Sequence, residues 1–237
     1  MRYTSFVCLL VLSFASNAYV LGPTSPGKWG NPVMGTGATI SYSFQNAGSC
    51  DSGACQGLSS FMPVGFQTEV EKAFDAWSAV ANLTFLEVAD DGADWNAATN
   101  SGDIRITGHA FDGSGGVLAH GFFPPNNGNT AAGDIHFDVD ENWKLNFGGL
   151  GFSIFQVMTH ELGHALGLGH SLVPGSLMNP FYTEAFEGVQ ADDIAGMQSI
   201  YGPSVAAVPI PAAIWMFASG LLGLVGMRKK IANTAIA

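Results

Sequence analysis

The order of apolar and polar residues along the chain predicts a mixture of strands and helices. Residues 38–44 alternate between apolar and polar side chains, which is typical of a strand with one buried face. In residues 66–82, apolar side chains recur at Val70, Phe74 and Trp77, a spacing that places them along one face of a helix. We expect this helix to pack its apolar face against the rest of the domain.

The remaining elements follow from the same patterns. Further strands are expected at 83–88, 102–106 and 134–138, and further helices at 153–166 and 189–201. Strands mixed with a few long helices indicate an α/β or an α+β fold. Of these we expect an α+β fold, an α/β sandwich in which helices pack on a sheet.

The composition is that of one domain of ordinary size with processing segments at its ends. Of 237 residues, 47% are hydrophobic, so a sizeable core can form. Asp and Glu number 19 against 8 Lys and Arg, for a net charge of −11. This acidity argues against a nucleic-acid partner, because phosphate binding requires a basic face. The excess of acidic residues has two other possible roles: it can keep the protein soluble, or it can supply carboxylate ligands for calcium.

The first 18 residues have the pattern of a secretory signal peptide. One Arg precedes an apolar run, and residues 16–18 favour cleavage after Ala18. Export would leave a short segment, 19–27, before the domain. Cys50 and Cys55 remain in the exported chain, where a disulfide can form. We favour this disulfide over a metal-binding pair, because a thiolate site would need more ligands nearby.

The end of the chain has the pattern of a sorting segment. A linker of small residues, 204–208, precedes 209–237, in which residues 210–227 carry no charge and a basic cluster follows. This stretch is near the minimum length of a membrane span. The segment resembles the PEP-CTERM signal of Gram-negative bacteria. The resemblance implies transient anchoring in the inner membrane, removal by an exosortase-type sorting protease, and delivery to the cell surface or extracellular matrix. The alternative is a plain C-terminal anchor.

The strongest chemical signal is the segment 160–170, HELGHALGLGH. His160 and His164 are four residues apart on the predicted helix, so both imidazoles project from one face and can bind one zinc ion. Gly167 lets the chain leave the helix in a left-handed conformation, which returns His170 as a third ligand. Three imidazoles leave one position on zinc open for water.

Glu161 follows the first ligand and can reach the zinc-bound water. Zinc lowers the pKa of that water toward about 7, so Glu161 can act as general base and then carry the proton to the leaving amine. The alternative is three histidines satisfied without metal, which would need many hydrogen-bond partners on a buried helix. We therefore predict a zinc hydrolase with Glu161 as its catalytic residue.

This segment resembles the zinc-binding signature of the metzincins, and other residues resemble the matrixins, the peptidase family of the matrix metalloproteinases. Met178 matches the methionine of their Met-turn beneath the zinc, and Pro180 and Tyr182 match a wall of their S1′ pocket. The likeness covers a domain that we place at 28–203. It implies the metzincin fold, with a twisted, mostly parallel five-stranded sheet, two long helices and a C-terminal helix, and metalloendopeptidase activity.

The resemblance also implies structural ions. Calcium would be bound by three carboxylates and three backbone carbonyls, those of Asp112, Asp138, Glu141, Gly113, Gly115 and Val117. Asp103 and Asp134 match the carboxylates of a second calcium site. His120 and His136 match two ligands of a structural zinc ion.

One loop departs from the family pattern. Matrixins carry a His-x-Asp pair before Phe-Asp-Gly, and the stretch between Asp103 and Asp112 is several residues shorter in this chain. Arg105 and Thr107 stand at the equivalent spacings and cannot replace those ligands. His109 is nearby and is a candidate third ligand of the structural zinc. The alternative is an exposed or hydrogen-bonded loop histidine.

The expected substrate is an extended polypeptide. Residues 117–121 would form an edge strand above the zinc, with Leu118 and Ala119 beside the substrate, and Pro180 and Tyr182 would form the opposite wall. One rival function is a binding module with an inactive site, which the intact ligands and general base argue against. Another is zinc hydrolysis of a non-peptide substrate, which the edge strand argues against. We expect a monomer.

Overall fold

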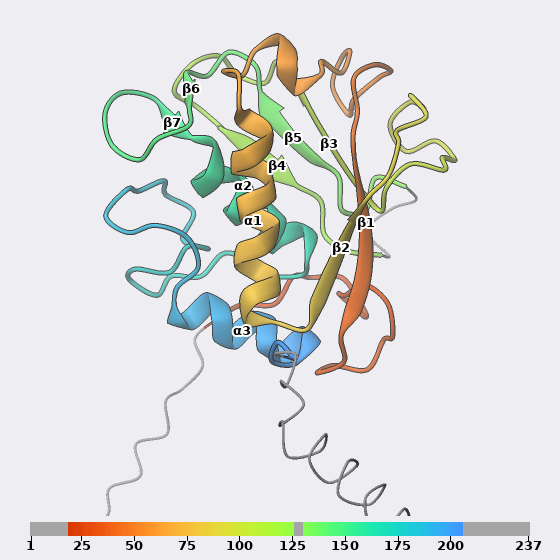
Figure 1. The fold of residues 1–237 in the computed structure, drawn as a ribbon, viewed down its shortest axis with the longest axis vertical. Helices are drawn as coiled ribbons and strands as arrows, with labels where there is room; N and C mark the ends of the chain where they lie inside the picture. The colour runs from red at the N-terminus through yellow and green to blue at the C-terminus, as the bar shows by residue number, and fades with distance from the viewer. Residues whose placement is uncertain (1–18, 126–129, 206–237) are drawn as a thin grey trace, which may run out of the picture. The chain divides into compact units, whose positions relative to one another are not determined.

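Five strands form the main sheet of the domain. A computed structural model describes residues 19–125 and 130–205. The strands are β1 (Ala38–Phe44), β2 (Leu83–Glu87), β3 (Ile104–His109), β4 (Ala119–Gly121) and β5 (Ile135–Asp138). Their order is β2-β1-β3-β5-β4 (Figure 1), with four parallel strands and β4 antiparallel to β5 at one edge. The mostly parallel five-stranded sheet predicted from the sequence is confirmed.

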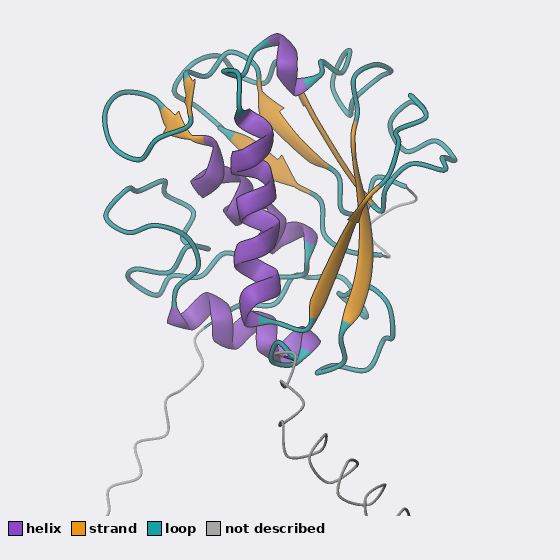
Figure 2. Cartoon of the chain, viewed as in Figure 1, coloured by secondary structure: helices purple, strands orange, loops and turns teal. Residues whose placement is uncertain are grey.

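Helices pack beside this sheet. The helices of the described residues are α1 (Phe66–Val80), α2 (Ile154–Ala165) and α3 (Ala191–Tyr201), with a short 3-10 turn, η1 (Leu58–Ser60) (Figure 2). The helices α1 and α2 are in direct contact, because Trp77 of α1 donates through Nε1 to the carbonyl of Thr159 in α2 at 3.0 Å. The α+β class and its three helices are as predicted.

One face of the sheet carries the apolar core. Side chains alternate along each strand, so every second residue of β1, β3 and β5 points toward the helices. Ile40, Ile106 and Phe137 are fully buried there. Tyr42 stacks on Phe74 of α1 with ring centroids 4.2 Å apart. The helical spacing that predicted α1 thus identifies the face that meets the sheet.

The opposite face of the sheet is polar but also buried. Arg105 and His136 are each 0% exposed. The Arg105 guanidinium pairs with Asp90, with Nε 3.0 Å from Oδ2, and donates to the Ala93 carbonyl at 2.8 Å. These contacts offset the desolvation of the charge. The loop that contains Asp90 and Ala93 therefore covers this part of the face.

The ends of the elements differ from their predicted bounds for local reasons. Helix α1 ends at Val80 because Ala81 is extended, with φ −129° and ψ 161°. Helix α2 begins after Ser153, whose side chain accepts from the backbone of the first turn as an N-cap. Helix α3 begins after Gln190, which forms a capping box. Strand β3 continues to His109 because its last residues pair with β5.

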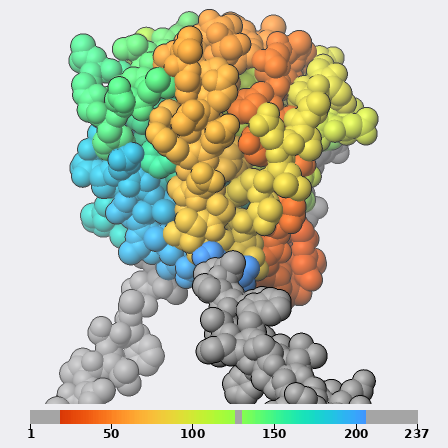
Figure 3. Space-filling model, in the orientation of Figure 1, coloured from red at the N-terminus to blue at the C-terminus, as the bar shows by residue number. Residues whose placement is uncertain are grey.

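A second, small sheet leads into α2. It consists of β6 (Trp143–Lys144) and β7 (Phe152–Ser153), which run parallel. Figure 3 shows α1 across the middle of one face of the domain.

The described residues up to Ser204 belong to one compact unit. Among the described residues, no helix has the length and apolar character needed to cross a membrane. The predicted signal peptide, 1–18, and sorting segment, 209–237, with its apolar stretch 210–227, lie outside the described residues.

Candidate active site

Two histidines project from one face of α2 with their ring centroids 4.8 Å apart. Each ring is oriented by a hydrogen bond from Nδ1 to a backbone carbonyl. His160 bonds to Leu177 and His164 to Leu168, both at 2.7 Å. Because a carbonyl only accepts, Nδ1 carries the proton, and Nε2 of each ring keeps its lone pair. This is the tautomer in which such a histidine binds a metal.

The chain turns sharply after α2. Gly167 has φ +112°, and a Cβ there would lie 2.3 Å from the Gly27 carbonyl oxygen, so both conformation and space require glycine. The turn brings the ring of His170 to 4.6 Å from that of His164 and 5.3 Å from that of His160. One ligand atom of each imidazole lies within 4.8 Å of the other two.

All three imidazoles are held neutral. Burial lowers the pKa of His160 to about 4 and that of His164 to about 3, and it also lowers the pKa of His170. Neutral rings with free lone pairs are the ligands that zinc requires, and three of them leave one position open. The residues present therefore fit a catalytic zinc ion.

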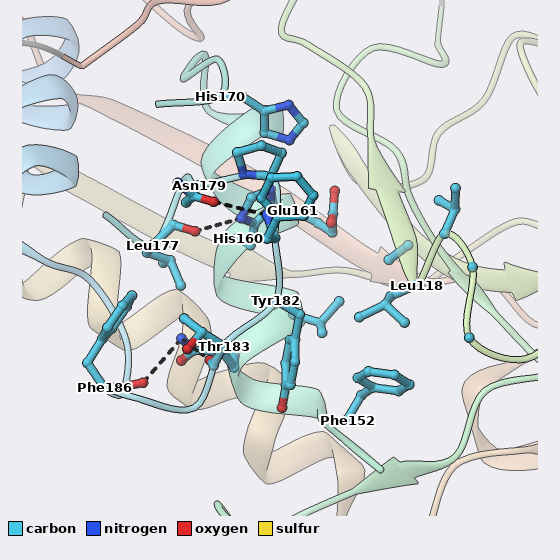
Figure 4. A pocket seen from close by; sticks show the side chains of 18 residues that line it. Leu118, Phe152, His160, Glu161, His170, Leu177, Asn179, Tyr182, Thr183 and Phe186 are labelled. Carbon is cyan, nitrogen blue, oxygen red and sulfur yellow. Dashed lines mark hydrogen bonds between the residues drawn. The ribbon is translucent and has the colours of Figure 1, made fainter. Parts of the chain in front are cut away.

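Glu161 lies beside the histidines and is 7% exposed. Burial raises its pKa to about 8, and a hydrogen bond with the Gly121 backbone acts in the opposite direction. A cation bound by the neighbouring imidazoles would favour the carboxylate form. The side chain lines the cleft next to His160 and His170 (Figure 4). It is placed to exchange a proton with a group bound there.

A tight turn supports the histidines from the side of α3. Met178 is 1% exposed, and it fills the space beside Gly163, where a Cβ would lie 2.4 Å from the Met178 sulfur. Buried Asp193 of α3 holds this turn, because its Oδ2 accepts from the Leu177 amide at 2.8 Å and its Oδ1 from the Met178 amide at 3.1 Å. The Leu177 carbonyl in turn orients His160.

A cleft of about 540 Å³ passes the histidines. One wall is formed by residues 115–119, which lead into β4, and the other includes 179–183. The four residues predicted to contact substrate, Leu118, Ala119, Pro180 and Tyr182, all line the cleft. Figure 4 shows Phe152 and Tyr182 together at the end away from His170.

Sequence reasoning missed several residues of this cleft. Gln156 connects α2 to the segment 183–188, because its Oε1 accepts from the Gly188 amide at 2.9 Å and its amide group donates to the Phe186 carbonyl at 3.4 Å. Its position in the sequence could have indicated this role, because Gln156 lies four residues before His160 and therefore on the same face of the helix.

An ion pair fixes the outer part of the same wall. Lys144 Nζ lies 2.7 Å from Glu184 Oε1, and both side chains are mostly buried. Glu184 also accepts from the hydroxyl of Tyr182 and from the Gly148 amide. These contacts join β6 to the segment after Tyr182. They were also not predicted, because nothing in the local sequence pairs residues so far apart.

Comparison with known proteins agrees with this geometry. A sequence model of the matrixin family matches residues 58–202. The chain belongs to the matrixin family. Interstitial collagenase of Sus scrofa is 46% identical over 136 residues, which are 57% of this chain and 28% of that protein. Karilysin of Tannerella forsythia is 40% identical over 141 residues, 57% of this chain and 28% of karilysin.

A further relative, the hatching enzyme of Paracentrotus lividus, is 43% identical over 144 residues, 56% of this chain and 22% of that enzyme. The chain therefore spans less than a third of the length of these relatives.

The three predicted calcium carboxylates, of Asp112, Asp138 and Glu141, differ in their hydrogen bonds. Asp138 and Glu141 are buried, and Oδ2 of the first and Oε2 of the second have no hydrogen-bond partner. Glu141 Oε1 accepts from the Gly115 amide at 2.6 Å. The Asp112 carboxylate accepts instead from the Val117 amide at 3.1 Å. Within the described residues, the clusters with all ligand atoms inside 4.8 Å do not include these three carboxylates.

The two carboxylates of the predicted second calcium site have different surroundings. Asp103 is exposed, and its Oδ2 accepts from the amide and hydroxyl of Ser41 at 2.8 and 2.7 Å. Asp134 is 1% exposed, and its Oδ2 is without a partner. Burial raises the pKa of Asp134 to about 7, although Arg105 acts to lower it. The structure thus leaves one buried carboxylate oxygen for a cation, at Asp134.

A second group of histidines lies on the polar face of the sheet. Its members are His109, His120 and His136, from β3, β4 and β5. One ligand atom of each lies within 4.8 Å of the others and of a carboxylate oxygen of Asp51. Sequence reasoning proposed the three histidines but missed Asp51. This residue lies inside a loop closed by a disulfide between Cys50 and Cys55.

The charges of this second group also suit a metal. Burial lowers the pKa of His120 to about 4, and His136 acts in the same direction. Burial acts to raise the pKa of Asp51, but the hydrogen bond with His136 and the nearby imidazoles outweigh it and bring the pKa to about 2. Neutral imidazoles and an ionised carboxylate are zinc ligands.

Proposed function

We propose that this chain is a secreted zinc-dependent metalloendopeptidase that hydrolyses peptide bonds in extracellular proteins. The observation that carries the proposal is the convergence of three neutral imidazoles beside the buried Glu161, at the floor of a cleft. Membership of the matrixin family supports it.

The residues of the site have separate tasks in this reaction. Zinc, bound by His160, His164 and His170, would supply a Lewis acid that polarises the scissile carbonyl and acidifies water. Glu161 takes the proton from the attacking water and passes it to the leaving amine. Burial raises the pKa of Glu161, and a cation bound by the imidazoles would act in the opposite direction, toward the carboxylate that accepts a proton.

We propose an extended polypeptide as substrate. Strand β4 is the last in the sheet order, so the side of its backbone away from β5 can pair with a peptide. Leu118 and Ala119 lie on that wall, and Pro180 and Tyr182 on the opposite one. Phe152 and Phe186 make the inner part of the cleft apolar, which favours an apolar substrate side chain.

The proposal predicts that the purified full chain cleaves an unstructured protein such as casein, and that 1,10-phenanthroline stops the cleavage because it removes zinc. The non-chelating 1,7-isomer is the matched control, and added zinc should restore activity. Gel electrophoresis and mass spectrometry of the products measure the result. Cleavage that persists in the chelator would contradict a zinc mechanism, and a zinc-loaded chain that cleaves no peptide bond would favour a binding module or a non-peptide substrate.

Calcium is proposed as a structural ion at Asp112, Asp138 and Glu141. The supporting observation is the pair of buried carboxylate oxygens without partners, one on Asp138 and one on Glu141. The Asp112 side chain would rotate away from the Val117 amide to complete the set of calcium ligands. A buried carboxylate without a partner is costly, and a cation removes this cost.

Removal of calcium is therefore expected to lower the melting temperature while zinc is replenished, because calcium binds only the folded loop. Differential scanning calorimetry measures the shift. The matched control is Asp138→Asn combined with Glu141→Gln, in which removal of calcium should shift the melting temperature much less than in the parent chain. An unchanged melting temperature of the parent chain would contradict this calcium site.

We propose that the chain is exported and reaches the cell surface or the extracellular space. The support is the sequence pattern of residues 1–18 and 209–237, which resemble a signal peptide and a PEP-CTERM sorting segment. An exosortase-type protease would be a processing partner, and residues 210–227 would contact the inner membrane before cleavage.

A further inference from the structure

We propose that Asp51, carried by the disulfide loop Cys50–Cys55, is the fourth ligand of a second zinc ion bound by His109, His120 and His136. The proposal concerns the polar face of the sheet and does not depend on peptidase activity. It accounts for the shortened loop before Asp112, because the carboxylate that this loop lacks comes from another segment of the chain.

The disulfide loop is anchored beside the first of these histidines. Gln56, the residue after Cys55, pairs with Gly108 through two backbone hydrogen bonds of 2.7 and 3.0 Å. Gly108 directly precedes His109 in β3. Within the loop, the Cys50 amide donates to the Gly53 carbonyl at 2.9 Å. These backbone hydrogen bonds and the disulfide hold the loop, and with it Asp51, against the sheet.

The possible ligand atoms of the four side chains lie close together, and too few protons lie between them for each to make a hydrogen bond. His109 Nδ1 is 3.0 Å from the Ala110 carbonyl oxygen, so its proton is on Nδ1 and Nε2 presents a lone pair. This Nε2 is buried and makes no hydrogen bond, although Asp51 Oδ1 is only 2.9 Å away. With no proton on Nε2, this close approach to a carboxylate oxygen is repulsive unless a cation bound by both atoms offsets it.

The distances between the donor atoms match those of a zinc shell. His136 Nδ1 lies 3.0 Å from Asp51 Oδ1 and 3.1 Å from His120 Nε2, and His120 Nε2 lies 3.6 Å from Asp51 Oδ2. Ligands about 2.0 Å from a tetrahedral zinc ion lie about 3.3 Å from one another. The observed distances fall on both sides of this value. Three imidazoles and one carboxylate complete four-coordination, as in a closed structural site.

The position of this site connects it to the substrate cleft. His120 lies in β4, and Ala119 before it lines the cleft. Zinc at the second site would join β4 to β3, β5 and the disulfide loop. Loss of this ion is therefore expected to loosen the edge strand against which we propose that the substrate pairs.

The test counts zinc in the full chain carrying Glu161→Ala, so that no self-cleavage interferes. We expect two zinc ions per chain by elemental analysis. Asp51→Asn should weaken the second site by at least about 10-fold in competition with a chelator, since even loss of an outer-shell partner has an effect of this size. The double variant Cys50→Ser and Cys55→Ser keeps Asp51 but removes the disulfide that closes its loop. It should also weaken zinc binding at the second site.

Two control variants separate this site from the catalytic one. Asp94→Asn changes a residue that holds the same loop through the Ser49 amide at 2.8 Å but is not among the donors, and it should keep both ions. His164→Ala should lose only the catalytic ion.

Each alternative outcome has a definite meaning. A parent chain with one zinc ion, lost in His164→Ala, would overturn the second site and leave the proposed function intact. Two ions bound equally tightly in Asp51→Asn would overturn the role of Asp51, and tight binding in the serine pair would overturn the role of the disulfide. A chain with two zinc ions and no peptidase activity when Glu161 is present would overturn the proposed function and leave Asp51 as a ligand.

Discussion

Replacing Glu161 by alanine is expected to lower kcat by about 10²–10⁴-fold, the usual effect of removing a general acid–base. The zinc content should stay at the value of the parent chain, because the ligands are the imidazoles and their Nδ1 hydrogen bonds do not involve Glu161. The measurement is steady-state cleavage of a fluorogenic peptide together with elemental analysis of the same sample.

The control for this variant is Glu71→Ala on the exposed side of α1, which changes the same residue type far from the cleft. It should leave kcat within experimental error of the parent. Glu161→Gln tests the charge alone, since it keeps the size of the side chain. A Glu161→Ala chain that retains zinc and cleaves at the parent rate would refute the proposed role of Glu161.

Replacing Asp193 by alanine is expected to produce the largest loss of stability, at least about 3 kcal/mol, which corresponds to a fall of about 6 °C or more in Tm. Asp193 is 1% exposed and accepts hydrogen bonds from the amides of Leu177, Met178 and Gln190. Alanine would leave the Leu177 and Gln190 amides without this acceptor, whereas the Met178 amide also donates to the Ser176 hydroxyl. Each buried unpaired donor costs about 1–3 kcal/mol.

The neighbouring residue provides a matched control for Asp193. Asp192 accepts one hydrogen bond, from the Ser171 hydroxyl at 2.7 Å, so Asp192→Ala should cost only about 1 kcal/mol. Chemical denaturation of both variants measures the difference. The Asp193 variant should also bind the catalytic zinc more weakly, because the turn that it holds carries the Leu177 carbonyl that orients His160. Equal stability of the two variants would show that the turn is held by other contacts.

Local patterns explain why much of the fold and the catalytic site could be predicted. The alternation in residues 38–44 and the helical spacing of Val70, Phe74 and Trp77 depend only on which side of each element is buried, and the structure confirms both elements. The segment 160–170 is similarly local. Helix periodicity and a left-handed glycine suffice to bring its three histidines together.

Contacts between distant segments explain what could not be predicted. The Lys144–Glu184 ion pair joins segments with no common pattern, and its geometry depends on how β6 lies against the residues after Tyr182. The likeness to matrixins predicts Asp112 as a calcium ligand together with Asp138 and Glu141, and this stays a prediction; in the structure the Asp112 carboxylate accepts from the Val117 amide. Side-chain direction in a glycine-rich loop depends on local hydrogen bonding, which a residue match does not specify.

By itself, the sequence determined the α+β class and the zinc-binding segment with Glu161, because these depend on the periodicity of single elements. Only the tertiary structure decided that Gln156 secures the wall of the cleft and that Asp51 faces the second group of histidines. Strand pairing brings His109, His120 and His136 to one face of the sheet, and the Gln56–Gly108 pairing brings the disulfide loop to the same place. Contacts of this kind depend on backbone pairing between distant segments, and the residues involved show no regular spacing in the sequence.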